Sequence, residues 1–258
     1  MGWVNNVAIQ LTNLTKIFGE KPAVLNLNLS VPKGSFFGLV GPNGAGKTTT
    51  LSMTTGLLRP THGQALINGI DIWQEPLKAK AELGVLADGV KLFDRLTGRE
   101  LVVYNGLLRG MNREIVDQRT AELLNALELT EDANKLVVDY SSGMTKKIAL
   151  AAALIHAPKV LVLDEPFESV DPVSSAVIRS ILHGYIQGGG TVVLSSHVME
   201  LVEKLCTHVA VIAQGQVLAA GPTAEVTAGK SLDERFVELV GGRGLVEGEL
   251  SWLQQSQD

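Results

Sequence analysis

The segment 41–48 constrains the fold of this chain more than any other part of its sequence. It reads Gly-Pro-Asn-Gly-Ala-Gly-Lys-Thr and matches the pattern G-x-x-x-x-G-K-[ST]. Glycines let a backbone curl until several N–H groups point at phosphate oxygens, and a helix N-terminus behind them adds positive potential. The apolar run 36–40 predicts a strand before the loop, and a helix is expected over about residues 47–58, stopping at Arg59-Pro60. The sequence therefore predicts a strand, a phosphate-binding loop and a helix.

Three side chains at the end of this segment have the chemistry to hold a nucleoside triphosphate. Lys47 is expected to reach the β- and γ-phosphates, Thr48 to bind Mg²⁺ through its hydroxyl, and Thr49 to donate towards the α-phosphate. An ordinary glycine-rich turn is the alternative, and it leaves the Lys-Thr pair at this spacing unexplained. The residues assigned to the nucleotide here are Gly41, Pro42, Asn43, Gly44, Ala45, Gly46, Lys47, Thr48 and Thr49.

A pair of carboxylates follows the apolar run 160–163. In doubly wound sheets, ligands bind at the carboxyl ends of the strands, where such a pair would lie. Asp164 is suited to hold Mg²⁺ through its water shell, and Glu165 to orient or deprotonate an attacking water. Taken alone, the pair would be an exposed acidic turn. Because a phosphate loop lies upstream, we favour the catalytic interpretation.

The apolar patterns along the chain predict an α/β fold. Helical periodicity extends from about residue 92 to residue 157, with Val116, Leu123, Leu124 and Leu127 recurring on one face. Strands are expected at residues 7–11, 25–29, 36–40, 160–163 and 191–194, helices at 174–186 and 199–205, and a closing hairpin at 209–218. Parallel buried strands with an inserted helical subdomain are the natural arrangement of these elements.

The composition indicates the cellular compartment of the protein and the classes of partner to expect. With 258 residues, 45% of them hydrophobic, the chain is long enough for one domain with a substantial core. A net charge of −5 gives no basic footprint, so we expect no nucleic-acid partner. The single cysteine, Cys206, fits a reducing compartment. No secretory leader is expected, and apolar stretches such as 148–155 fall short of the roughly 20 residues of a membrane span, so direct membrane insertion is not expected.

A third motif, Tyr-Ser-Ser-Gly-Met-Thr-Lys-Lys at residues 140–147, precedes the carboxylate strand. Its pattern alone predicts a helix N-cap at Ser141, Ser142 and Gly143. The segment 140–147 resembles the signature motif of ATP-binding cassette (ABC) ATPases. Together with the other motifs, the resemblance to this family extends over roughly residues 7–224. The resemblance implies a P-loop NTPase (RecA-like) core with an N-terminal antiparallel β subdomain and an inserted α-helical subdomain. It also implies that these residues contact the γ-phosphate bound to a second subunit, in a dimer with two ATP molecules at its interface.

Four further positions take their expected roles from this resemblance. Phe18 matches the aromatic residue that stacks on adenine, with a plain core or turn aromatic as the alternative. Asp171 matches the D-loop aspartate, although Glu168-Ser169 departs from the usual Asn-Gly. His197 matches the switch histidine that senses the γ-phosphate, and it joins Lys47 and Glu165 as a catalytic candidate. Asp88 stands where the family usually has Gln, and it is assigned to nucleotide and metal with reduced reach towards Mg²⁺.

The same resemblance predicts the boundaries of the domain and of its parts. A single ABC ATPase domain is expected over residues 1–240, with a core at 1–87 and 158–225 and the helical subdomain at about 88–157. Residues 241–258 are expected to form a C-terminal tail.

The function expected from the resemblance is that of the ATPase subunit of an exporter of a drug, antibiotic, peptide or ion. ATP and Mg²⁺ are the expected cofactors. The partners would be separate membrane-spanning permease subunits and a second ATPase subunit, in a homodimer or with a related cassette. Such a protein would be cytoplasmic and peripheral on the membrane. A soluble ABC ATPase without a transport role and a nucleotide-gated immunity or regulatory module remain the alternatives.

Overall fold

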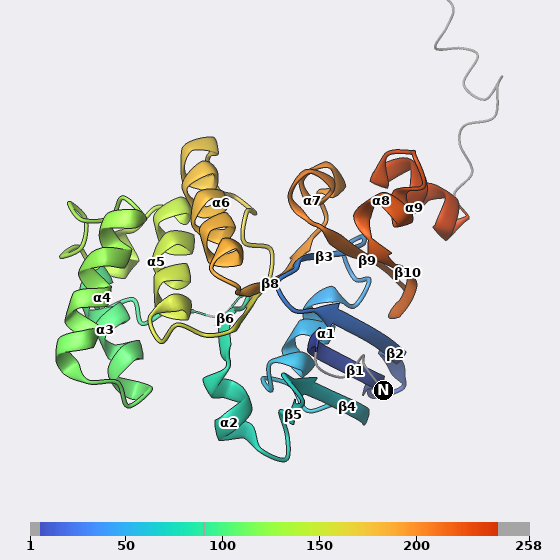
Figure 1. Cartoon of the computed structure of the whole chain (residues 1–258), viewed down its shortest axis with the longest axis horizontal. Coiled ribbons are helices and arrows are strands. Elements are labelled where there is room, and N and C mark those ends of the chain that lie inside the picture. The colour runs from blue at the N-terminus through green and yellow to red at the C-terminus, as the bar shows by residue number, and fades with distance from the viewer. Residues whose placement is uncertain (1–5, 90, 242–258) are drawn as a thin grey trace, which may run out of the picture.

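A computed structural model describes residues 6–89 and 91–241 of the chain, and it contains two sheets and the helices that cover them (Figure 1). The first sheet is antiparallel, with strand order β2-β1-β4-β5. Its strands are β1 (Val7–Phe18), β2 (Lys21–Pro32), β4 (His62–Ile67) and β5 (Ile70–Asp71). The second sheet has the order β10-β9-β3-β8-β7-β6 and is parallel except for β10. Its strands are β3 (Phe36–Val40), β6 (Leu83–Leu86), β7 (Val160–Leu163), β8 (Thr191–Ser196), β9 (His208–Ala213) and β10 (Gln216–Pro222).

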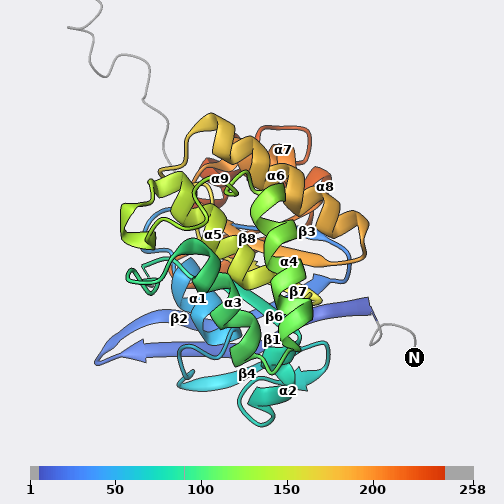
Figure 2. The same cartoon turned by 90° about the vertical axis from the view of Figure 1, so that its left-hand side faces the viewer.

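The helices lie on both faces of the parallel sheet and beyond its β6 edge. They are α1 (Lys47–Thr54), α2 (Pro76–Ala81), α3 (Gly98–Leu108), α4 (Arg113–Ala126), α5 (Ser142–Leu154), α6 (Pro172–Gln187), α7 (Met199–Leu205), α8 (Thr223–Thr227) and α9 (Leu232–Val240). Helices α3, α4 and α5 pack against one another, and α5 also packs against β6. Figure 2 looks onto this helical group and shows the antiparallel sheet below it.

Side-chain alternation along the buried strands separates two apolar layers. In β3, Phe36 and Val40 belong to the layer that contains α5, α6 and α7, whereas Phe37 and Leu39 belong to the layer that contains α1 and the antiparallel sheet. The residues of β7 divide between the layers in the same way. Because both faces of the parallel sheet are covered, its strands are mostly apolar, as the sequence indicated, and the polar residues Ser195 and Ser196 lie at the carboxyl end of β8. The predicted α/β class and the N-terminal antiparallel sheet are thus confirmed.

Several boundaries differ from the sequence-based expectation. Helix α1 ends at Thr54 and not near residue 58, because Gly56 adopts a φ of 71° and the carbonyl of Ser52 accepts hydrogen bonds from the N–H groups of Leu57 and Leu58. Strands β1 and β2 are each 12 residues long, well beyond the predicted segments. Strands β4, β5 and β6 and helices α2, α8 and α9 were not predicted. The expected tail lies outside the described residues, apart from Gly241, which caps α9.

None of the helices within residues 6–89 and 91–241 has both the length and the apolar character needed to cross a bilayer.

Candidate functional site

A cavity of about 560 Å³ lies where the phosphate loop meets the carboxyl ends of the parallel strands. It brings together most of the residues that the sequence assigned to nucleotide and catalysis. The predicted residues that line it are Phe18, Asn43, Gly44, Gly46, Lys47, Thr48, Thr49, Asp88, Glu165 and His197. Phe18 ends β1 with its side chain 51% exposed, so it is not a core aromatic, and Lys16 Nζ lies 5.2 Å from its ring centroid.

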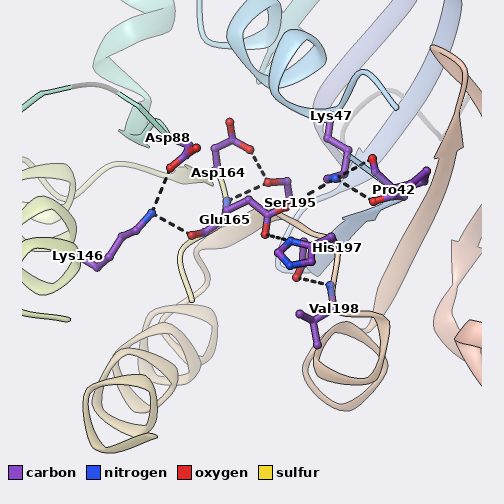
Figure 3. A network of polar contacts seen from close by, with 11 residues as sticks. Pro42, Lys47, Asp88, Lys146, Asp164, Glu165, Ser195, His197 and Val198 are labelled. Carbon is purple, nitrogen blue, oxygen red and sulfur yellow. Dashed lines mark hydrogen bonds and ion pairs between the residues drawn. The ribbon is translucent and has the colours of Figure 1, made fainter. Parts of the chain in front are cut away.

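The loop is held in a curled conformation by its glycines and by Lys47. Gly46 has a φ of 103°, and a Cβ atom there would lie 2.7 Å from the carbonyl oxygen of Ala23. Only glycine meets both conditions without strain. The buried ammonium of Lys47 donates to the carbonyl oxygens of Gly41 at 2.8 Å and Pro42 at 3.2 Å (Figure 3). The loop therefore holds a positive charge in the wall of the cavity, just before the N-terminus of α1.

The two carboxylates after β7 are linked by a serine from β8. Ser195 is fully buried, and its hydroxyl donates to Asp164 Oδ1 at 2.5 Å while accepting from the N–H of Glu165 at 2.9 Å. Asp164 is itself only 3% exposed. Because a buried carboxylate needs hydrogen bonds or a cation, the Ser195 hydroxyl stabilises its position at the end of the strand.

Glu165 is the centre of the polar network that Figure 3 shows. Its Oε1 lies 3.6 Å from Lys47 Nζ, and its Oε2 lies 3.1 Å from His197 Nδ1. A carboxylate can only accept, so the Nδ1 of His197 carries the proton in this contact. Glu165 also has a φ of 44°, an uncommon conformation for a residue other than glycine, and such conformations cluster at functional sites.

Asp88 lies at the boundary between the parallel sheet and the helical group. Its Oδ1 is 3.5 Å from the ammonium of Lys146 on α5, and this ammonium also donates to the carbonyl oxygen of Glu165 at 3.0 Å. Asp88 therefore lines the cavity as expected, but its carboxylate is paired with a lysine that the sequence analysis did not assign to the site.

The signature residues lie apart from the cavity lining. Ser141 caps α5 by accepting from the N–H of Met144 at 3.2 Å, which confirms the predicted N-cap. Ser142 donates to the carbonyl oxygen of Ser169 at 2.6 Å, and a Cβ atom on Gly143 would lie 2.8 Å from a carboxylate oxygen of Asp171. The signature residues thus form a second group with Ser169 and Asp171, outside the lining of the cavity around Lys47.

Asp171 is fixed by its own helix cap. Its Oδ1 accepts from the N–H groups of Ser174 at 2.9 Å and Val173 at 3.0 Å, at the start of α6. The hydrogen bonds from Ser174, above all the one from its backbone, lower the pKa of the Asp171 carboxyl below its ordinary value. The carboxylate therefore stays ionised beside Gly143.

The donor set around the loop fits a nucleotide with Mg²⁺. Thr48 lines the cavity, and Asp164 lies at the end of β7, which β8 separates from the strand before the loop. Within residues 6–89 and 91–241, no cluster of three or more His, Cys, Asp or Glu side chains could enclose a metal. The hydroxyl of Thr48 and the carboxylate of Asp164 suit Mg²⁺, which is bound through one or two protein ligands together with phosphates and water.

Several residues of the site escaped the sequence analysis. Ser195 and Lys146 contact the carboxylates directly, and Lys21 and Glu168 line the cavity. Glu168 was noted as a departure from the usual D-loop sequence but was not assigned to the nucleotide site. Ser195 carries no motif signal, because only the pairing of β7 with β8 brings it beside residues 164 and 165.

Comparison with known proteins agrees with this geometry. Residues 24–168 match the family model described as ABC transporter. The linearmycin resistance ATP-binding protein LnrL of Bacillus subtilis is 38% identical over 213 residues, which cover 83% of this chain and 68% of LnrL. The ABC transporter ATP-binding protein NatA of the same organism is 37% identical, with 83% of this chain and 89% of NatA covered.

Solved structures show the same architecture. An ATP-binding subunit of an ABC transporter superposes with a TM-score of 0.84 at 25% identity, covering 90% of this chain and 99% of that one. A dimeric ATP-binding cassette in a post-hydrolysis state with ADP and Pi superposes with a TM-score of 0.77 at 27% identity, covering 83% of this chain and 98% of its own. The phosphate loop, the paired carboxylates and the capped signature helix, in a fold shared with these proteins, identify the chain as a member of the ABC transporter family, an ATP-binding subunit that hydrolyses ATP.

Proposed function

We propose that this chain powers the export of a drug, antibiotic, peptide or ion through separate membrane-spanning subunits, by closing as a dimer around ATP. The observation that carries the proposal is the separation of the two groups of site residues. Lys47, Glu165 and His197 line the nucleotide cavity, whereas Ser141 and Gly143 lie outside its lining. A second subunit can present its signature helix to the nucleotide bound here, and this one can do the same in return.

Each side chain of the cavity has a defined part in hydrolysis. Lys47 binds the β- and γ-phosphates, and Thr48, in the cavity lining with Asp88, holds Mg²⁺ together with Asp164 at the end of β7. When bound, Mg²⁺ neutralises charge that develops on the phosphate oxygens. Glu165 accepts a proton from the attacking water, and His197, hydrogen-bonded to Glu165 Oε2, orients that carboxylate towards the γ-phosphate.

Glu165 and Lys47 form an ion pair in the structure. Their atoms lie 3.6 Å apart, and both side chains are largely buried. An entering γ-phosphate competes with Glu165 for the Lys47 ammonium. Binding of ATP would therefore release the carboxylate to hold water on one side and His197 on the other.

A permease would contact the helical group on its exposed apolar side chains. Phe93 is 59% exposed and Leu108 is 70% exposed, and the Phe93 ring packs edge-on against Tyr104 at 5.3 Å. Neighbouring exposed apolar side chains are typical of surfaces that bind a partner. This contact would place the subunit on the cytoplasmic face of the membrane. The name of LnrL, which refers to antibiotic resistance, favours a drug or antibiotic as the exported substrate.

The test of this function is steady-state release of phosphate from ATP by the purified chain and by Glu165→Gln. We expect the variant to lose at least about a hundredfold in kcat while it still binds ATP, because it cannot accept the proton of water. Glu200→Gln, on the exposed face of α7, is the matched control and should keep the activity of the parent chain. Equal rates for the parent chain and Glu165→Gln would refute the assignment. Failure of an integral membrane protein to co-purify from membranes would refute the export role.

A further inference from the structure

Lys146 joins two segments that belong to different parts of the fold. It lies on α5 in the helical group, and its ammonium donates to the carbonyl oxygen of Glu165, just after β7. The same ammonium lies 3.5 Å from Asp88 Oδ1, in the loop after β6 (Figure 3). One cation thus contacts the loop that follows each of two neighbouring strands.

Asp88 stands in the wall between two cavities. It lines the nucleotide cavity and also a second cavity of about 410 Å³, which Lys146 lines together with residues of α3 and α5. The Lys146 side chain is 17% exposed and that of Asp88 is 45% exposed. The lysine is therefore the more buried partner, and the half-exposed carboxylate of Asp88 lies within ion-pair distance of it.

Removing the charge of either Lys146 or Asp88 leaves the other charge unpaired, which costs free energy. Without Lys146, the carboxylate of Asp88 is unpaired beside a space that receives phosphates, and like charges repel. Without the charge of Asp88, Lys146 is a largely buried ammonium with only a carbonyl oxygen as partner, and a buried charge needs an opposite charge or several hydrogen bonds. A neutral side chain at both positions leaves neither charge unpaired.

We propose that Lys146 is a positioning residue, which ties Asp88 to the backbone of Glu165 and so fixes the loop at residue 88 relative to the base that activates water. The proposal rests on the function proposed above for Glu165. It also explains how the chain functions with a shorter, charged side chain where a glutamine is usual: the lysine supplies the hydrogen-bond donor that the carboxylate lacks.

A double-mutant cycle tests this role. Asp88→Gln, Lys146→Gln and the double variant are compared with the parent chain for kcat, for KM with MgATP and for urea unfolding without nucleotide. We expect each single variant to lose about tenfold in kcat with a smaller change in KM. The double variant should be at least about threefold faster than the product of the two single effects predicts. Single effects on kcat that multiply to within twofold would overturn the proposal.

The pair formed by Lys159 and Glu82 is a matched control. These residues precede β7 and β6, at the opposite ends of the same two strands, and their charged atoms lie 3.0 Å apart. Neutralising Glu82, Lys159 or both should shift urea unfolding without any coupling in kcat. An equal coupling in kcat for this pair would show that Lys146 acts only through stability, and would also overturn the proposal. The parent chain and Glu165→Gln, assayed alongside, test the hydrolytic function itself. A failure of that function is thereby distinguished from a failure of the positioning role proposed for Lys146.

Discussion

The single hydroxyl of Ser195 helps to position both Asp164 and Glu165. In Ser195→Ala, buried Asp164 loses the hydroxyl that donates to it, and the N–H of Glu165 loses its acceptor. We expect unfolding to become easier by about 1–3 kcal/mol. We also expect kcat to fall by roughly tenfold to a hundredfold, as it does when residues that orient metal ligands are lost.

Ser196 provides the control for this prediction, measured by urea unfolding and phosphate release. It is the next residue of β8, it is also buried, and its hydroxyl accepts from the N–H of Val198 at 3.0 Å without touching either carboxylate. Ser196→Ala should therefore lose stability but keep its kcat within a few-fold of the parent. Similar losses of kcat in the two variants would show that Ser195 has no special role.

His156 makes stability depend on pH. Burial, followed by the charge of Arg109, lowers the pKa of its imidazole from 6.5 to about 4, and its Nε2 donates to the carbonyl oxygen of Leu83 at 2.9 Å. Below pH 6.5 the unfolded chain binds the proton and the folded chain does not, so this residue's contribution to stability is complete above pH 6.5 and is lost as the pH falls towards 4.

Comparison of the parent chain with His156→Gln by urea unfolding measures this effect. The difference in unfolding free energy between the two should shrink by up to roughly 3 kcal/mol from pH 7 to pH 4. His62→Gln, which replaces an exposed imidazole at the start of β4, is the matched control. A constant difference between the parent chain and His156→Gln across this range would mean that the imidazole titrates normally in the folded state.

At the scale of elements, two helical glycines should respond in opposite ways to the same substitution. A Cβ atom on Gly98, in the first turn of α3, would lie 2.0 Å from the Tyr140 hydroxyl, which is itself held by the carbonyl oxygen of Asp132. A Cβ atom on Gly184, inside α6, would meet nothing within 4 Å. We expect Gly98→Ala to destabilise the chain by about 1–3 kcal/mol through overpacking. Gly184→Ala should stabilise it by about 0.5–1 kcal/mol, the usual preference of helices.

Thermal or urea unfolding of the two alanine variants checks this pair of predictions. The further variant Gly98→Ala/Tyr140→Phe removes the hydroxyl that the new methyl would meet, and it should recover part of the loss. Stabilisation by Gly98→Ala would show that the contact between α3 and Tyr140 is loose.

The elements whose bounds were predicted correctly are those that a local sequence pattern specifies. Strand β3 and helix α7 begin and end where expected, because an unbroken apolar run and a clear helical segment specify them. Strand β4 is exposed over its first three residues, and α2 has only six residues, so neither shows the periodicity of a buried element. The end of α1 is marked in the sequence by Gly56, but the predicted helix extends to about residue 58 because Arg59-Pro60 served as its stop signal.

At the scale of the whole molecule, the motifs were predictable but their contacts were not. The sequence identified the phosphate loop, the carboxylates and His197, and the structure gathers Glu165, His197 and most of the loop in one cavity, with Asp164 buried at the end of β7. The bridge from Lys146 to Asp88 could not be predicted, because it depends on where the helical group packs against the sheet. The separation of Gly143 from that cavity likewise follows from tertiary packing, and it is the feature from which we infer a second subunit.

The most direct test of this composite site is the molecular mass of Glu165→Gln in solution, measured by sedimentation equilibrium with Mg²⁺ in the absence and presence of ATP. Without ATP, we expect a monomer of 27.5 kDa. With ATP, we expect the mass to double, because the nucleotide is retained and contacts both subunits, and this stabilises the closed dimer. Lys47→Ala in the same background should remain monomeric, since it removes the cation that binds the phosphates. A Glu165→Gln protein that binds ATP without any ATP-dependent association of two ATPase subunits, either alone or in complex with its permease, would contradict the composite site.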